Sequence, residues 1–183
     1  MPRNRQHIPR DQRAADLLEA ATKVFVHKGY AGTTMTDISD AAGVVRANIY
    51  WYFQSKDDIF AAVMGELYDA EFSDLTGRES DLDAYDRLTL GMKRLYPYRF
   101  LHLDMHARIQ QSETVRQAHD RFMSWMQGLV YEIVDQAGAD VDRQILAEVV
   151  MAIFEGARTP TETRPAVELI PFVLRLAVGK EGS

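Results

Sequence analysis

The stretch from Thr33 to Phe53, TTMTDISDAAGVVRANIYWYF, decides the fold of this 183-residue chain. Thr34 stands three residues before Asp37, so its hydroxyl can cap a helix while the carboxylate reaches back to an amide at the same helix end. Gly43 follows where a left-handed residue would end that helix. Helical spacing then resumes over Val45 to Phe53. The stretch therefore predicts two short helices joined by a glycine turn, which is a helix-turn-helix hairpin.

This hairpin and its flanks resemble the N-terminal domain of TetR-family transcriptional regulators over Leu17 to Phe60. A single matching position would be a weak signal, but an ordered set over roughly 45 residues is not expected from an unrelated fold. The resemblance covers about the first third of the chain. The matching residues are Leu17, Ala21, Val24, Phe25, Lys28, Gly29, Tyr30, Thr33, Thr34, Asp37, Ile38, Ala42, Gly43, Val44, Tyr50, Phe53, Ser55, Lys56, Ile59 and Phe60.

The whole chain is expected to be all-α, because apolar residues recur at spacings of three and four and period-two alternation is absent. Its length and 46% hydrophobic content suit one small and one larger domain. We expect a basic disordered arm over residues 1–11 and a three-helix helix-turn-helix DNA-binding domain over residues 12–55. Residues 56–183 are expected to form a helical bundle, for which the resemblance implies ligand binding and dimerisation.

Local signals place the individual helices. Pro171 must either delay the last helix or kink it. Helix 56–75 is the expected connector between the two domains. The expected helices span residues 12–28, 56–75, 81–96, 99–111, 113–136, 141–157 and 167–178, with breaks at residues 77–80 and 159–165.

The charge is unevenly distributed along the chain. The net charge is −6, but residues 1–60 contain eight Lys or Arg against seven Asp or Glu, whereas residues 61–183 contain thirteen against twenty. The acidic excess is therefore C-terminal, which leaves the N-terminal part compatible with a nucleic-acid partner. Arg3, Arg5 and Arg10 can form an arm that reaches phosphates or a minor groove. The alternative is a tail that only improves solubility.

Several classes of protein are disfavoured by what the sequence lacks. There is no cysteine, so neither a disulfide framework nor a thiolate site is available. The N-terminus has no apolar signal core and no run of eighteen apolar residues occurs, so we expect a cytoplasmic protein without a membrane partner. An enzyme is not expected, because no Ser-His-Asp order, phosphate-binding glycine loop or metal-ligand spacing is present.

The start of the second hairpin helix is the expected base-reading element. Arg46, Ala47 and Asn48 occupy the end that enters the major groove in helix-turn-helix proteins. Arg can bond both acceptors of guanine, and Asn can pair with adenine. Ordinary solvated surface is the alternative for both side chains.

Other side chains are expected to contact the DNA backbone. The resemblance implies phosphate contacts for Tyr50, Tyr52 and Lys56. Thr34 and Thr36 can donate to phosphates in the same way, although Thr34 is needed at least as much as a helix cap.

At three positions in the hairpin the sequence leaves the contact with DNA open. Trp51 can pack on thymine methyl groups and sugars or cover its own core. Val45 stands where the family usually has Ser or Thr, and Ala47 where Gly is common; Val45 would still lie in the DNA interface but cannot cap its helix.

The expected function is a sequence-specific DNA-binding transcriptional regulator, a ligand-responsive repressor that binds a pseudo-palindromic operator as a homodimer. The alternative is a helical protein-interaction module that has lost DNA binding.

His102, Met105 and His106 are candidates for a metal site, because residues four apart share a helix face and imidazole is a common ligand. Structural zinc requires four ligands, and only Asp104 and the distant His119 are further candidates. The sequence therefore favours core or interface histidines and predicts no metal and no cofactor.

A small apolar or aromatic effector is expected in the C-terminal domain, since Met and aromatic side chains adapt to such ligands and the resemblance implies an effector there. The same residues can equally form ordinary core. The candidates are Met92, Tyr96, Phe122, Trp125 and Met126.

The last two helices are the expected homodimer interface, because family members dimerise through such helices; an intrachain core would show the same apolar stripe. The candidates are Leu146, Val149, Val150, Ile153, Phe154, Phe172, Val173 and Leu176.

Overall fold

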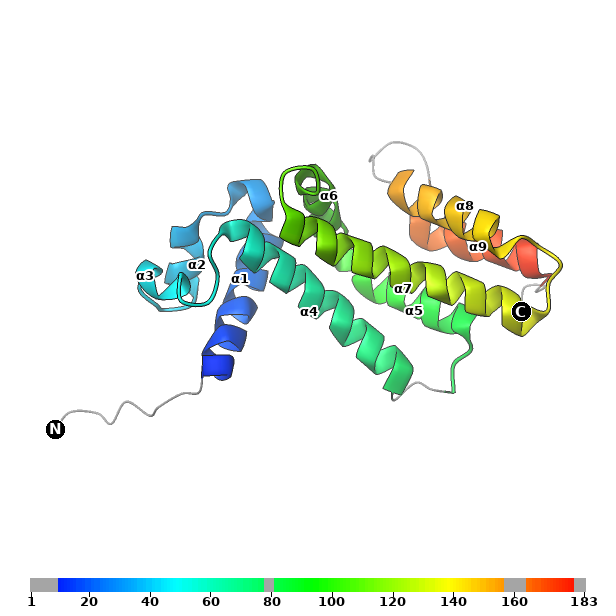
Figure 1. Ribbon diagram of the computed structural model, residues 1–183, viewed down its shortest axis with the longest axis horizontal. Helices are drawn as coiled ribbons and strands as arrows, with labels where there is room; N and C mark the ends of the chain where they lie inside the picture. The colour runs from blue at the N-terminus through cyan, green and yellow to red at the C-terminus, as the bar shows by residue number, and fades with distance from the viewer. Residues whose placement is uncertain (1–9, 78–80, 157–163, 180–183) are drawn as a thin grey trace. The chain divides into compact units, whose positions relative to one another are not determined.

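The computed structural model describes residues 10–77, 81–156 and 164–179, and this part of the chain is helical and contains no strand (Figure 1). The all-α prediction is confirmed. Residues 1–9 of the expected arm, residues 78–80 of the expected break at 77–80 and residues 159–163 of the expected break at 159–165 lie outside the described residues, whereas Gly77 is helical. The helices are α1 (Arg10–Gly32), α2 (Met35–Ala41), α3 (Arg46–Ile49), α4 (Lys56–Gly77), α5 (Ala84–Leu95), the 3-10 helix η1 (Tyr96–Tyr98), α6 (Arg99–Arg108), α7 (Glu113–Ala137), α8 (Arg143–Gly156) and α9 (Ala166–Val178).

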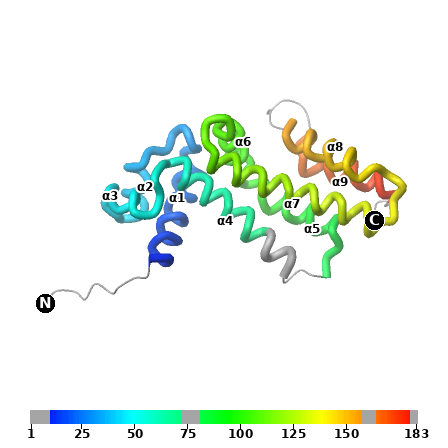
Figure 2. The backbone as a smooth tube through the Cα atoms, in the orientation of Figure 1, coloured from blue at the N-terminus to red at the C-terminus, as the bar shows by residue number. Residues whose placement is uncertain are grey.

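The chain divides into two compact units, whose segments can be followed by residue number along the tube in Figure 2. The first unit comprises Met1–Glu66 and Phe100–Ala118, and the second comprises Leu67–Arg99 and His119–Ser183. The first unit therefore contains α6 in addition to the hairpin. None of the helices in the described ranges is both long enough and apolar enough to cross a membrane.

The core of the first unit forms around aromatic side chains from α1 and α4. Phe25 and Phe60 are fully buried, and their ring centroids lie 5.1 Å apart. Tyr30 packs against Phe60 at 5.0 Å. Ile38 of α2 and Ile49 of α3 are also fully buried. Each hairpin helix is thus anchored to this core by one large aliphatic side chain, which removes it from water and stabilises the unit by about 1.5–3 kcal/mol.

A break in α1 at Gly29 shapes the end of that helix. Gly29 has a φ of 69° and a ψ of 172°, a conformation that favours glycine. Beyond the break, the backbone N–H of Tyr30 donates to Oδ2 of Asp104 on α6 at 2.7 Å. A Cβ at position 29 would approach the same carboxylate oxygen to 3.3 Å. A side chain here would therefore be strained both by the positive φ and by this close contact.

An ion pair also holds α6 to the start of α4 within the first unit. Arg108 donates from Nε and Nη2 to the two carboxylate oxygens of Asp57, at 3.2 Å and 2.7 Å. The Tyr30 hydroxyl donates to the same carboxylate. Burial raises the pKa of Tyr30, and the hydrogen bond to Asp57 raises it further. The end of α1, the start of α4 and α6 are therefore joined by a charge-assisted network.

In the second unit, Pro171 lies within the last helix rather than before its start. This residue lies inside α9, which begins at Ala166, so the helix does not start late. Pro171 is buried, and its carbonyl accepts a 3.3 Å hydrogen bond from the Tyr85 hydroxyl of α5. Arg175 of α9 donates to the same hydroxyl at 2.8 Å. Contacts with α5 therefore hold α9 beside Pro171, although neither bond replaces the backbone donor that proline lacks.

Candidate nucleic-acid interface

The entry to α2 is fixed by the capping box that the sequence predicts. The Thr34 hydroxyl accepts from the Asp37 amide at 3.1 Å, and the Thr34 amide donates to the Asp37 carboxylate at 2.8 Å. The Thr34 hydroxyl also donates to that carboxylate at 2.7 Å. Its only proton is therefore used within the cap, whereas the side chain of Thr36 is exposed.

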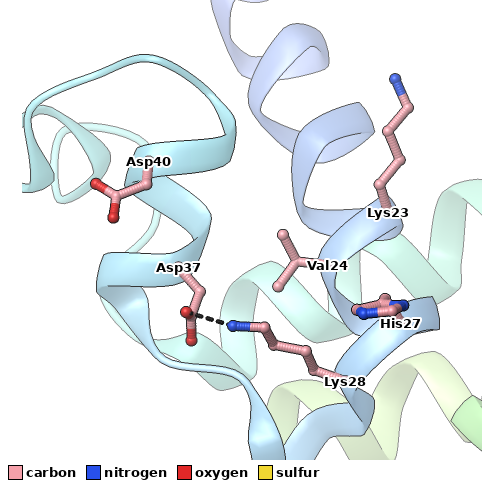
Figure 3. A pocket seen from close by; sticks show the side chains of 6 residues that line it. All are labelled: Lys23, Val24, His27, Lys28, Asp37 and Asp40. Atoms are coloured by element: carbon pink, nitrogen blue, oxygen red, sulfur yellow. Dashed lines mark hydrogen bonds and ion pairs between the residues drawn. The ribbon is translucent and has the colours of Figure 1, made fainter.

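Lys28 of α1 joins this cap from across an open pocket between α1 and α2 (Figure 3). Its ammonium lies 2.6 Å from the Asp37 carboxylate. Hydrogen bonds from Lys28 and then from Thr34 hold the pKa of Asp37 well below its usual range. The carboxylate therefore stays charged, and its ion pair with Lys28 connects α1 to the start of α2. The pocket is lined by Lys23, Val24, His27, Lys28, Asp37 and Asp40.

The second hairpin helix is shorter than expected. We predicted helical structure over residues 45–53, but α3 ends at Ile49 and a turn follows, in which the Phe53 amide bonds to the Ile49 carbonyl at 3.0 Å. Val45 is the N-cap and provides no side-chain hydrogen bond, as its apolar side chain dictates. The lack of a cap and the bulky residues that follow both disfavour a longer helix.

An exposed surface nevertheless forms along α3 and the turn after it. Val45 is 69% exposed and Trp51 is 76% exposed, so Trp51 does not cover its own core. The Arg46 guanidinium donates to the Tyr50 hydroxyl, one turn along, at 3.2 Å. We call this surface the reading face; its exposed members are Val45, Arg46, Ala47, Asn48, Tyr50 and Trp51.

Arg10, which we expected in a mobile arm, is the first residue of α1 and contacts the turn after α3. Its guanidinium donates to the Trp51 carbonyl at 3.0 Å and lies 5.8 Å from the ring centroid of the half-buried Tyr52. This long-range contact helps to hold the turn in place. No local sequence pattern indicates it, because the two partners are 41 residues apart.

Lys56 points into the first unit rather than only toward solvent. Its ammonium donates to the carbonyls of Tyr30 and Thr33, at 2.8 Å and 2.7 Å, and lies 4.0 Å from the Tyr30 ring centroid. Burial lowers the pKa of Lys56, and the nearby Asp57 opposes that shift. Two of the three ammonium protons are thus engaged, which leaves one for the predicted phosphate contact.

The residues predicted for an effector pocket lie in the second unit with different exposures. Met92, Phe122 and Met126 are buried, Trp125 is half-buried and Tyr96 is 40% exposed. Phe122 takes part in an aromatic cluster, with its ring centroid 4.2 Å from that of Tyr68 and 5.5 Å from that of Phe154. Their role as a ligand pocket stays a prediction.

The residues predicted for a dimer interface fall into three groups on α8 and α9, which pack side by side (Figure 1). Ile145, one turn before Val149 on α8, is 59% exposed and was not among the predicted residues. Leu146 and Val150 are buried; Ile153, Phe154 and Val173 are half-buried; Val149, Phe172 and Leu176 are exposed.

Two short helices at a glycine turn, with the second anchored by one isoleucine and otherwise exposed, define a helix-turn-helix protein. Residues 17–63 match the family described as "Bacterial regulatory proteins, tetR family". Residues 17–63 therefore form a domain of this tetR family, as the N-terminal resemblance indicated.

Named relatives match part of the chain, and solved structures share its fold. The HTH-type transcriptional regulator TtgR of Pseudomonas putida is 34% identical over 97 residues, which cover 53% of this chain but only 45% of TtgR. The chain thus spans less than half the length of that relative. The uncharacterized HTH-type transcriptional regulator YfiR of Bacillus subtilis is 28% identical over 139 residues, covering 69% of this chain and 68% of YfiR. A transcriptional regulator from Saccharomonospora viridis, crystallised in complex with choline, has the same fold, with a TM-score of 0.70, 19% identity, and 94% and 98% of the two chains covered.

Proposed function

We propose that this protein is a cytoplasmic transcriptional repressor that binds a pseudo-palindromic DNA operator as a homodimer and releases it when a small molecule binds. The observation that carries the proposal is the reading face, where six neighbouring side chains are exposed while Ile49 alone anchors α3. A protein needs such an arrangement to insert a helix into a groove without unfolding its core.

The chemistry of the reading face suits DNA. Arg46 and Asn48 carry the donors that match guanine and adenine edges, and the bond from Arg46 to the Tyr50 hydroxyl restrains the guanidinium before binding. Tyr50 and Tyr52 offer hydroxyls for phosphates, and Trp51 offers a flat apolar surface for sugars and thymine methyl groups. Lys56 can add its remaining N–H to a phosphate.

Exposed apolar side chains on α8 and α9 support the homodimer. Ile145, Val149, Phe172 and Leu176 are between 41% and 69% exposed, and burying them against a second copy would remove them from water. A twofold dimer would present two reading faces to two half-sites of one operator.

The effector is proposed to be a small molecule that binds within the second unit, near the aromatic cluster of Tyr68, Phe122 and Phe154. Aromatic and Met side chains there favour an apolar or aromatic ligand. The choline complex of the S. viridis regulator is consistent with a small-molecule ligand on this fold. An effector can release DNA only by binding the DNA-free conformation more tightly.

Selection of binding duplexes from a random DNA pool tests the proposal. We expect an inverted repeat from the purified protein at physiological salt, with binding that strengthens as salt is lowered. Arg46→Ala should weaken binding to the selected site by about 1–3 kcal/mol and relax one base position. Arg121→Ala is the matched control, because Arg121 is also exposed but lies on α7. Failure to enrich any site, or salt-independent binding, would instead favour a protein-interaction role.

A further inference from the structure

Two histidines on α6 point their ring nitrogens at each other. His102 and His106 are four residues apart, so they lie on the same face of the helix. Their Nε2 atoms are 3.0 Å apart and the ring planes are inclined by 79°. His102 is only 9% exposed and His106 is half-buried. Both belong to the first unit, which also contains the reading face.

This separation also fits two nitrogens bound to one metal ion. With metal–nitrogen distances of about 2.05 Å, two nitrogens 3.0 Å apart subtend an angle of about 94° at the metal. That angle is close to the 90° of square-planar and octahedral sites, and an increase of about 0.3 Å in the separation gives the tetrahedral angle. Imidazole pairs four residues apart on a helix bind such ions, whereas Mg²⁺ and Ca²⁺ prefer oxygen ligands.

Four protein ligands are required only of a closed structural metal site. A site that regulates binding need not be closed, because water or additional side chains can complete the coordination. The alternative for the pair is an N–H···N hydrogen bond between two neutral imidazoles. That hydrogen bond also suits a 3.0 Å separation, so the distance does not separate the two explanations. They differ in whether added metal binds to the pair.

Helix α6, which carries the histidine pair, is also bonded to the end of α1 and the start of α4. Asp104, between the two histidines in sequence, accepts the Tyr30 amide, and Arg108 pairs with Asp57 at the start of α4. An ion held by His102 and His106 would fix the turn of α6 that contains Asp104, directly before Arg108. Any difference in metal affinity between the DNA-bound and DNA-free conformations would then appear as a change in operator affinity.

We propose that His102 and His106 bind one divalent late transition-metal ion, of the class of Zn²⁺ or Ni²⁺, and that this ion modulates DNA binding through α6. The regulatory half of the proposal rests on the proposed function, whereas the binding half does not.

The binding half is tested on the full chain without DNA. After metal is removed with a chelator, titration calorimetry with Zn²⁺ alone and with Ni²⁺ alone should give one ion per chain. X-ray absorption of the loaded protein should show at least two imidazole nitrogens. Removing a residue that only hydrogen-bonds to a metal ligand typically lowers metal affinity by about tenfold or more. Removing a ligand itself should lower it further, so His106→Ala should weaken metal binding by at least about tenfold. His27→Ala is the matched control, because His27 is exposed on α1.

Unchanged metal affinity in His106→Ala, in protein whose circular dichroism and melting temperature match the wild type, would overturn the binding half and favour the hydrogen-bonded pair. So would a first shell with fewer than two imidazoles. The regulatory half is measured separately, as operator affinity of the wild type with and without the ion. A shift of at least about threefold that disappears in His106→Ala supports it, and equal affinities overturn it while leaving the metal site intact. Failure to find any operator would count against the proposed function alone.

Discussion

The ion pair between Asp57 and Arg108 should make a measurable contribution to folding. The perturbation is a double-mutant cycle with Asp57→Asn, Arg108→Ala and the double variant. The side chains are 18% and 25% exposed and are joined by two hydrogen bonds of 3.2 Å and 2.7 Å. Exposed pairs contribute only about 0.2–1 kcal/mol. A pair that is mostly shielded from water and bonded through two nitrogens should contribute more, even after desolvation. We expect a coupling energy of about 1.5 kcal/mol.

The coupling should also depend on pH with a definite sign. Burial by itself would raise the pKa of Asp57, but hydrogen bonds from Arg108 and then Tyr30 outweigh it and the pKa is lowered. A carboxyl whose pKa is lower in the folded state stabilises the protein above its unfolded pKa of about 4. That stabilisation is lost as the pH falls through the folded value. The coupling should therefore be complete at pH 7 and decline below pH 4.

Urea unfolding of the four proteins, monitored by circular dichroism at pH 7 and at several values down to pH 2, measures both quantities. Unfolding must be reversible and two-state for the cycle to apply. A coupling energy below about 0.3 kcal/mol at pH 7, which is within the error of additivity, would refute the argument. So would a coupling that persists unchanged at pH 2, because the carboxyl would then not be the charged partner.

Two other predictions concern the cap and the interface. Thr34→Ala should lower the free energy of unfolding by about 1 kcal/mol, since it removes the α2 cap, whereas Thr36→Ala on the same helix should change it by less than about 0.5 kcal/mol; equal losses in urea unfolding would contradict the capping role. Leu176→Glu places a charge at a side chain that is 69% exposed and should convert a dimer to a monomer in analytical ultracentrifugation without lowering the α-helical content; an unchanged sedimentation coefficient would move the interface elsewhere.

Local features of this fold could be predicted from the sequence because their physical causes are local. Thr34 and Asp37 are three residues apart, and the capping box needs only that spacing. Gly29 breaks α1 because a residue without a Cβ follows a run of helix formers. The second hairpin helix begins where the sequence predicts it, at Arg46 after Val45, but α3 ends at Ile49 rather than at Phe53.

Features that depend on tertiary packing could not be predicted in this way. The acceptors of Lys56 lie 23 and 26 residues before it, so its inward direction depends on how α1 meets α4. The path of α9 through Pro171 depends on support from Tyr85, 86 residues earlier. The convergence of His102 and His106 depends on side-chain rotamers, and spacing alone indicates only a shared face.

The hydrogen bond from Arg10 to the Trp51 carbonyl bears on how the protein should be shortened for experiments. A chain trimmed to begin at residue 11 would keep all the matched family residues and still lose the donor that restrains the turn after α3. Such a protein should fold, yet its recognition segment should exchange amide hydrogens faster and pay more ordering entropy on meeting DNA. A weak binding result from a trimmed chain would then reflect the trimming rather than the natural protein.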